Sequence, residues 1–298
     1  MEQSFRDILK QRVLVCDGAM GTMLQANGMP GGHCSEEWNL SHPDVIRGIH
    51  KAYLDAGADI IETNSFGGNR YRLAFHNQAD HLAELNEKAG HIAHEICPPG
   101  KWVGGSVGPT GEFLQPMGAL TFDQLKAAFS EQITALLHGG VDLIVVETMS
   151  DPQEGRAAIE AARDLDADIP ILASMTFEKK PTGYRTMMGI SPEEMPAVYQ
   201  QAGADVIGAN CGSGMDDMLA IVAILREHTD MPILAQANAG LPVTEEGRVI
   251  YKETPEERAA AVEKILKSGV NIVGGCCGTT PAHIAATSRV VRAFNRGH

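Results

Sequence analysis

Residues 202–211 read AGADVIGANC, a run that passes from the end of a helix through a short apolar segment to polar residues. A glycine at this place is typical of a helix C-terminus, and the aliphatic residues after it predict a buried strand. The same phrase, AGAD, opens another apolar run at 56–59, and the related GGVD opens a third at 139–142. A repeated junction of this kind predicts helices that alternate with parallel strands.

The whole chain follows that alternation. Eight apolar runs are predicted as strands, namely 13–17, 59–66, 102–108, 142–148, 171–177, 205–211, 232–238 and 271–277. Amphipathic helical patterns follow them, for example at 122–140, 215–228 and 255–269, and Thr254 is expected to cap the last of these. Eight βα units predict one α/β domain, a (β/α)₈ TIM barrel over residues 1–298. The alternative is an open doubly wound sheet, because periodicity does not show closure.

Composition and charge exclude several classes of protein. Hydrophobic residues make up 44% of the 298 residues and the formal net charge is −14, so a phosphate backbone or an anionic lipid surface is an unsuitable partner. We find no leader and no apolar run of about 20 residues, and therefore expect a cytoplasmic protein without nucleic-acid or membrane partners. Six cysteines are too sparse for a disulfide scaffold there, and thiols or metal ligands are expected.

Polar residues gather where the predicted strands end, which is where (β/α)₈ barrels carry their chemistry. These strand-end residues are Asp17, Glu62, Thr63, Asn64, Ser106, Glu147, Thr148, Asn210, Cys211, Asn238, Cys276 and Cys277. The segment at 24–44, after the first strand, is expected to be a loop over the same end of the barrel. None of the eleven histidines forms a metal or catalytic spacing, and no nucleotide fingerprint is present.

Three of the cysteines are candidate metal ligands. The sixth and eighth strands lie two apart around a closed barrel, so Cys211 and the adjacent Cys276 and Cys277 can meet over its mouth. Three thiolates with one open position suit a catalytic Zn²⁺. The alternatives are a vicinal disulfide and a pair of plain buried thiols. Cys16, Cys34 and Cys97 are interpreted as small buried side chains.

Neighbouring strand residues point to opposite faces, so a regular strand would separate the sulfurs of Cys276 and Cys277. Gly274, Gly275 and Gly278 are expected to allow a bulge or turn that brings both toward the barrel axis. A thiol substrate entering the fourth position would lose its proton to the metal and become a nucleophile. Asp17 and Glu147 are candidates to hold the ammonium group of an amino-acid substrate, or else to cap helices. Glu62 is a candidate to support the barrel interior.

The motifs LVCDGAMGTMLQ, AGADIIETNSF, GGSVGPTG, GVDLIVVET, GANCG, NAGLP and NIVGGCCGTTPAHI resemble those of the homocysteine S-methyltransferase family over nearly the whole chain. The sequence is most similar to the homocysteine-binding barrel of cobalamin-dependent methionine synthases. This resemblance implies a zinc-containing (β/α)₈ barrel with Cys211, Cys276 and Cys277 as the zinc ligands. It implies that homocysteine binds zinc through sulfur with its amino group near Asp17 and Glu147. It also implies that Asn238 can approach the metal when substrate is absent, and that Ala19 to Thr22 and Ser106 form part of the substrate pocket.

The resemblance leaves the methyl donor open. The loop after the first strand is shorter than in full-length synthases, and after residue 298 we expect no folate-binding barrel, cobalamin domain or reactivation domain. The expected function is methyl transfer to homocysteine, giving methionine, with the methyl group carried by a separate corrinoid (methylcobalamin) protein. S-methylmethionine or S-adenosylmethionine as donor, or another thiol as acceptor, are alternatives. An alternative of another class is a non-catalytic zinc barrel that acts as a docking subunit.

Overall fold

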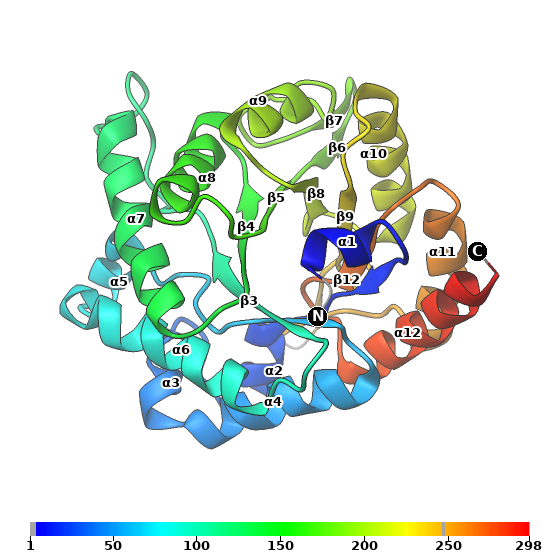
Figure 1. Ribbon diagram of the computed structural model, residues 1–298, viewed down its shortest axis with the longest axis horizontal. Helices are drawn as coiled ribbons and strands as arrows, with labels where there is room; N and C mark the ends of the chain where they lie inside the picture. The colour runs from blue at the N-terminus through cyan, green and yellow to red at the C-terminus, as the bar shows by residue number, and fades with distance from the viewer. Residues whose placement is uncertain (1–3, 246–247, 298) are drawn as a thin grey trace.

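The computed structural model describes residues 4–245 and 248–297, and its centre is a sheet of eight parallel strands (Figure 1). The strands pair in the order β1-β12-β9-β8-β5-β4-β3-β2. Their bounds are β1 (Leu14–Val15), β2 (Ile60–Glu62), β3 (Trp102–Val107), β4 (Leu143–Met149), β5 (Ile171–Met175), β8 (Val206–Asn210), β9 (Ile233–Ala237) and β12 (Ile272–Gly275).

The sheet closes on itself where β1 meets β2. Cys16 and Ile60 form an isolated parallel bridge between these two segments. The N–H of Asp17 donates to the carbonyl of Ile60 at 3.0 Å, and the N–H of Asp59 donates to the carbonyl of Val15 at 2.6 Å. Because both ends of the sheet are paired with each other, the fold is a single-domain (β/α)₈ barrel, as predicted, and not an open doubly wound sheet.

Most of the helices form a ring outside the strands, whereas α1 lies over one end of the barrel (Figure 1). Their bounds are α1 (Phe5–Leu9), α2 (Met20–Ala26), α3 (Trp38–Ser41), α4 (Pro43–Ala56), α5 (Arg70–Phe75), the 3₁₀ helix η1 (Ala79–His81), α6 (Leu82–Ile96), α7 (Phe122–His138), α8 (Pro152–Leu165), α9 (Met195–Ala202), α10 (Met215–His228), α11 (Pro255–Leu266) and α12 (Pro281–Arg296). Thr254 caps α11 and forms a capping box with Glu257, which confirms the prediction for that helix start.

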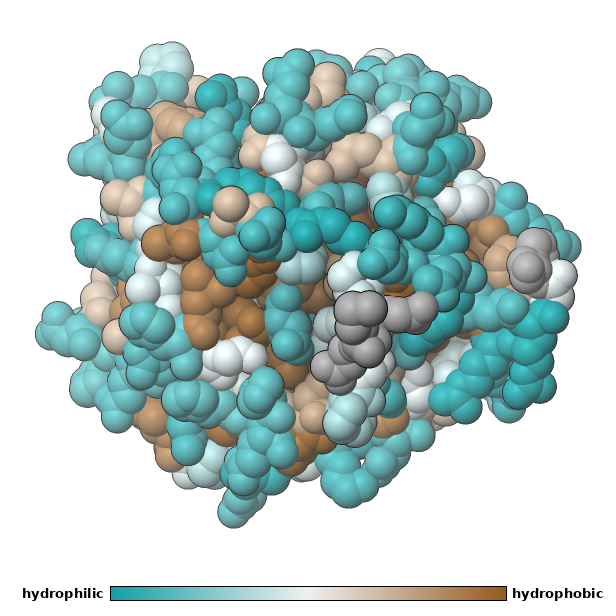
Figure 2. All heavy atoms as spheres, in the orientation of Figure 1, coloured by the Kyte–Doolittle hydropathy of each residue, from teal (hydrophilic) through white to brown (hydrophobic). Residues whose placement is uncertain are grey.

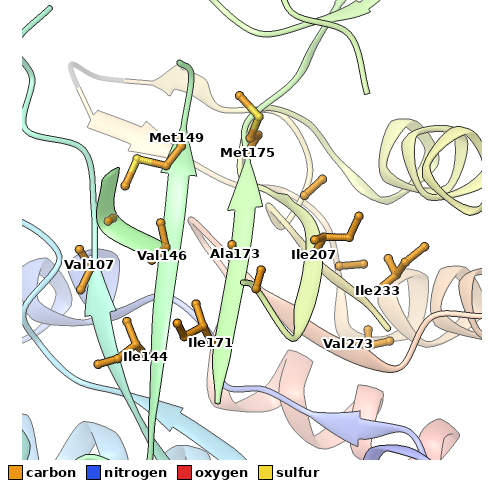
Figure 3. Close-up of a cluster of buried hydrophobic side chains, with 14 of the residues drawn as sticks. Val107, Ile144, Val146, Met149, Ile171, Ala173, Met175, Ile207, Ile233 and Val273 are labelled. Atoms are coloured by element: carbon orange, nitrogen blue, oxygen red, sulfur yellow. The ribbon is translucent and has the colours of Figure 1, made fainter. Parts of the chain in front are cut away.

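Side-chain alternation along the strands builds two apolar layers. One set, which includes Val146, Ala173 and Ile207, packs between the strands and the surrounding helices (Figure 3). The opposite set, which includes Leu143, Val145 and Leu172, fills the barrel interior together with Phe5 and Leu9 of α1. The short first helix therefore closes the N-terminal end of the barrel, and the other end is left for the site.

The same alternation places polar side chains nearer the C-terminal ends of the strands. Two residues beyond an inward-facing apolar residue or a glycine, the next inward position is polar on six strands. These positions are Glu62 on β2, Ser106 on β3, Glu147 on β4, Ser174 on β5, Asn210 on β8 and Gln236 on β9. A layer of carboxylates, amides and hydroxyls thus lies on top of the apolar interior.

The observed strands are mostly shorter than predicted, because pairing stops where the chain turns into the loops. The run predicted at 59–66, for example, pairs as β2 only to Glu62, and the N–H of Ser65 already donates to the carbonyl of Thr63 within a turn. The prediction of a plain loop at 24–44 is wrong, because α2 ends and α3 lies within this segment. Two antiparallel hairpins were not predicted. They are β6 (Glu178–Lys180) with β7 (Gly183–Arg185), and β10 (Val243–Glu245) with β11 (Arg248–Ile250).

The outer surface is mainly hydrophilic. Seen from the side on which α1 lies, polar residues cover the rim, and apolar atoms are grouped to the left of the centre (Figure 2). In the described residues no helix has both the length and the apolar character needed to cross a membrane.

Replacing Gly208 of β8 by alanine is expected to destabilise the barrel strongly. An added Cβ would lie 2.0 Å from the carbonyl oxygen of Leu234 on the neighbouring strand β9, and backbone cannot move aside without breaking the sheet. We expect the free energy of unfolding to fall by about 3 kcal/mol or more. Gly48 of α4 is the matched control, since nothing lies within 4 Å of the position that an added Cβ would take there. Gly48→Ala should instead raise stability, by up to about 1 kcal/mol. Denaturant unfolding of both variants measures the difference, and equal stability would contradict this account of Gly208.

Candidate metal and substrate site

A cavity of about 250 Å³ opens at the C-terminal end of the barrel. Its lining includes residues 18–22 after β1, residues 62–66 at the end of β2 and beyond, and the polar layer of the interior except Ser174. Cys211, Cys276 and Cys277 lie on one side of it. Of the segment at 24–44, Ser35 reaches the lining, and its carbonyl accepts a hydrogen bond from Asn64. That segment is therefore attached beside the opening.

The three candidate metal ligands meet at this cavity. Cys211 follows β8, whereas Cys276 and Cys277 follow β12, and β9 lies between these two strands. The Sγ atoms of Cys211 and Cys277 are 4.0 Å apart, and all three sulfurs lie within 4.8 Å of one another. Sulfurs on a tetrahedral zinc at the usual Zn–S distance are about 3.8 Å apart. The chain thus brings together three sulfurs at a spacing that fits one metal ion.

A β-turn explains how adjacent cysteines face one point. The N–H of Thr279 donates to the carbonyl of Cys276 at 3.0 Å, and Gly278 has a φ of 78°. Glycine at the third position with positive φ is typical of a type II turn. We call residues 276–279 the metal turn. The pair therefore lies in a turn beyond the strand, with Cys277 at its first corner.

The prediction that Gly274 and Gly275 allow a bulge or turn is wrong. Neither has a positive φ, and both belong to the regular strand β12. Glycine is needed at these two positions because a Cβ would clash with neighbouring atoms. A Cβ on Gly275 would lie 2.2 Å from Cγ2 of Thr279, and a Cβ on Gly274 would lie 2.7 Å from Cβ of Cys16. Of the three glycines, Gly278 alone acts through its backbone conformation.

The sulfurs are electrostatically coupled. Hydrogen bonds from Cys211 and Cys276 lower the pKa of Cys277 to about 3, and its partners have raised pKa values. Hydrogen bonding with Cys211, then with Cys277, and burial raise the pKa of Cys276. One thiolate is therefore favoured at neutral pH, and a bound cation would favour the thiolate form of all three. The donor set fits Zn²⁺.

Two acids line the cavity, and a third lies behind them. Glu62 and Glu147 belong to the lining, whereas Asp17 does not. Asp17 is 2% exposed, and its Oδ2 accepts the N–H of Glu62 at 2.9 Å. Burial, and next the charge of Glu62, raise the pKa of Glu147 to about 8. Burial also raises the pKa of Glu62 and, to a greater extent, that of Asp17.

This charge pattern indicates what the cavity can hold. Among the described residues that line it, none is lysine, arginine or histidine. Two carboxyl groups close together in a buried place favour a cationic group in the ligand, because a cation lowers their pKa values. Glu62 was assigned only a supporting position by the sequence analysis. Its inward register, two residues after Ile60, was the signal that could have placed it in the pocket.

Asn210 connects the acids to the thiols. Its Nδ2 lies 3.3 Å from Oε2 of Glu147, 2.7 Å from Oγ1 of Thr148 and 4.0 Å from Sγ of Cys276. Its Oδ1 accepts the N–H of Thr148 at 2.8 Å. Thr148 has a φ of 61°, which is rare for a β-branched residue and costs energy unless its surroundings hold it. Asn210 therefore fixes the backbone that orients Glu147, a role that the sequence analysis did not assign.

The remaining predicted site residues lie around the same cavity. Ser106 is part of the lining and donates from Oγ to Glu147 at 2.6 Å. Ala19 also lines it, at the start of α2, and its N–H donates to the carbonyl of Thr279 at 3.1 Å. Asn238 is buried just after β9, outside the lining, and its Oδ1 has no hydrogen-bond partner among the described residues.

Three thiols and two acids at the mouth of a (β/α)₈ barrel define a class of protein, a barrel with a candidate metal site and an acid-lined pocket. A family model described as homocysteine S-methyltransferase matches residues 14–291. The chain belongs to the homocysteine S-methyltransferase family, which confirms the resemblance seen in the sequence.

Curated relatives support this assignment. The chain is 36% identical over 309 residues to a methionine synthase of Mycobacterium tuberculosis (strain ATCC 25618 / H37Rv), covering 97% of this chain and 25% of that protein. It is 35% identical over 310 residues to a methionine synthase of Mycobacterium leprae (strain TN), covering 98% of this chain and 25% of that protein. The chain thus spans about a quarter of the length of these relatives.

Solved structures confirm the fold. The metallated form of the homocysteine methyltransferase MmuM from Escherichia coli is similar with a TM-score of 0.78 and 23% identity, over 96% of this chain and 98% of that chain. Its oxidized form gives a TM-score of 0.76 and 25% identity, over 95% of this chain and 97% of that chain.

Proposed function

We propose that this chain is a zinc-dependent homocysteine S-methyltransferase that forms methionine. The observation that carries the proposal is the meeting of three sulfurs from two different strand ends within 4.8 Å, beside a cavity lined by two acids. Family membership supports the reaction class, and the metallated form of a structural relative supports a metal in this fold. The cytoplasmic location remains a prediction of the sequence.

The residues of the pocket have complementary tasks in this proposal. Cys211, Cys276 and Cys277 would hold Zn²⁺, and a zinc ion there supplies the Lewis acidity that lowers the pKa of an incoming thiol. Glu62 and Glu147 receive the ammonium group of homocysteine, and Asp17 holds the main chain of Glu62 from behind. The cavity lining offers no cationic side chain among the described residues, so main-chain N–H groups near Met20 to Thr22 are left to bind the carboxylate.

The atoms of the reaction balance without a further oxidant or reductant. The homocysteine thiol loses its proton to water, and its sulfur attacks the methyl carbon of the donor. A sulfur–carbon bond forms, and the bond between the methyl group and the donor breaks with its electron pair passing to the donor. We propose a separate corrinoid protein as the donor, since DGAMGTMLQ and ETNSF resemble the cobalamin-linked branch of the family. S-methylmethionine and S-adenosylmethionine are the competing donors.

A parallel assay tests the proposed function. The purified chain is incubated with homocysteine and with methylcobalamin, S-methylmethionine or S-adenosylmethionine, and methionine is quantified. We expect methionine with methylcobalamin, because a corrinoid leaving group accepts the electron pair of the broken bond. Methionine formed only from S-methylmethionine or S-adenosylmethionine would show that this compound is the donor, and the proposed reaction with homocysteine would stand. No methionine from any of the three, in a chain loaded with zinc, would contradict the proposal.

A further inference from the structure

A fully buried arginine lies beneath the metal turn. Arg258 of α11 is 0% exposed and is the largest of the fully buried side chains. In the sequence it belongs to the run PEERAAAVEKIL, whose charged residues are typical of a solvent-facing helix. Taking an arginine out of water costs several kcal/mol unless its hydrogen bonds and charge are compensated. Its partners therefore indicate what this burial achieves.

Those partners are the end of β9, the end of the metal turn and an acid, Glu253. Nη2 of Arg258 donates to the carbonyl of Ala237, the last residue of β9, at 3.2 Å, and to Oγ1 of Thr279, the last residue of the metal turn, at 3.0 Å. Nε forms an ion pair with Oε1 of Glu253 at 2.6 Å. Nη1 has no hydrogen-bond partner among the described residues. The burial of the Arg258 guanidinium is therefore only partly compensated by its bonds, and holding it in this place costs free energy.

The end of β9 connects Cys211 to Cys276. The N–H of Cys276 donates to the carbonyl of Ala237 at 2.9 Å, and the N–H of Cys211 donates to the carbonyl of the preceding residue, Gln236, at 3.0 Å. Arg258 therefore binds the same carbonyl that positions Cys276 and ties it to the far end of the metal turn. The spacing between Cys211 and the pair on the turn depends on these bonds.

Thr279 extends this connection to the substrate side. Its carbonyl accepts the hydroxyl of Tyr53 at 2.8 Å and the N–H of Ala19 at 3.1 Å, and Ala19 lines the cavity. Tyr53 and Thr279 are each 0% exposed. The metal turn is thus held from below by a rigid buried layer, in which Arg258 is the cationic member.

We propose that Arg258 is a positioning residue of the metal centre. By joining the metal turn to the end of β9, its guanidinium keeps Cys276 and Cys277 at the distance from Cys211 that one metal ion requires, and its positive charge offsets the excess negative charge of three thiolates. This inference rests on the proposed zinc centre, although Arg258 itself contacts neither metal nor substrate.

Zinc retention measures this role directly. Wild-type protein, Arg258→Met and Thr279→Val are loaded with zinc, and the rate of zinc transfer to a chromophoric chelator is followed. Residues that orient metal ligands typically contribute 10- to 100-fold to metal affinity. We therefore expect Arg258→Met to release zinc about 10- to 100-fold faster than the wild type. Thr279→Val keeps the shape of the turn but removes the hydroxyl that accepts the hydrogen bond of Arg258. We expect this variant also to release zinc faster than the wild type, by a smaller factor. In the cobalt-substituted proteins the sulfur-to-metal charge-transfer bands should shift in both variants.

Arg163→Met is the matched control for stability. Arg163 also forms a partly buried ion pair, with Asp205, and donates to the carbonyl of Gly203, but it does not line the cavity or contact the metal turn. It should lower the thermal midpoint while leaving zinc release and the cobalt spectrum unchanged. Zinc release at the wild-type rate in folded Arg258→Met or, if that variant does not fold, in Thr279→Val would overturn the inference. A wild-type chain that binds no zinc would instead overturn the proposed function.

Discussion

Cys277→Ser is expected to abolish metal binding and methyl transfer while leaving the barrel folded. Wild-type protein should carry about one zinc per chain, and the variant close to none, since a catalytic zinc site has only three protein ligands. Activity should fall about a thousandfold or more, because Lewis-acid activation is worth several kcal/mol. Cys211→Ser should behave alike, since its sulfur lies 4.0 Å from that of Cys277 but comes from another strand end.

The barrel core gives the reason for expecting a folded variant. Cys277 is partly exposed and lies beyond the end of β12, so a serine there removes no packing from either apolar layer. Cys97→Ser is the matched control, because Cys97 is also a partly exposed cysteine but lies at the end of α6, outside the cavity lining. Metal analysis and circular dichroism on all three variants decide the matter. Zinc kept by both Cys211→Ser and Cys277→Ser would refute the ligand set.

Glu147→Gln should discriminate between thiol acceptors with and without an ammonium group. The change removes negative charge but keeps the shape of the side chain and its contacts with Ser106 and Asn210. A hydrogen bond to a charged group contributes about 1.5–3 kcal/mol, so kcat/KM for homocysteine should fall about 10- to 150-fold. With 4-mercaptobutyrate, which lacks the amino group, the variant and the wild type should differ little.

Variants of the other two acids locate the ammonium group. Glu62→Gln should match the effect of Glu147→Gln, because both side chains line the cavity. Asp17→Asn should have a smaller effect, since Asp17 lies behind Glu62 and retains its bond to the N–H of that residue. Equal losses with homocysteine and 4-mercaptobutyrate in Glu147→Gln would show that this acid does not recognise the ammonium group. Steady-state kinetics with both acceptors provides the comparison.

The barrel and the position of the three cysteines were predictable from the sequence. Strand periodicity and strand count imply which ends of strands share a face, and the strand order places Cys211 two strands from the Cys276–Cys277 pair. The reason for Gly274 and Gly275 was not predictable, because it depends on how Thr279 folds back in the turn and on where Cys16 lies beside the neighbouring strand. A single chain shows local conformational needs but not distant steric contacts.

Arg258 and Asn210 show a second limit of sequence reasoning. Arg258 lies in a helix with charged neighbours, and only tertiary packing turns it toward Ala237 and Thr279. Asn210 lies at a predicted strand end, yet its connection to Glu147 and Thr148 depends on the side-chain directions of two strands separated by β5. The sequence therefore marks where Asn210 lies but does not show which side chains it positions.

β1, the first strand of the chain, pairs with β12, the last, and this pairing affects the order in which the protein folds during synthesis. The main-chain N–H and carbonyl of Val13 form hydrogen bonds with the side-chain amide of Asn295, which lies 282 positions further along the chain. A ribosome that has released only the first 270 residues has therefore made an unclosed sheet in which Cys211 still lacks both of its partners. Contacts so remote in the chain form slowly. If the proposed zinc centre is correct, the nascent chain acquires its full ligand set only when the βα unit that carries Cys276 and Cys277 has emerged, and zinc uptake then reports closure of the barrel.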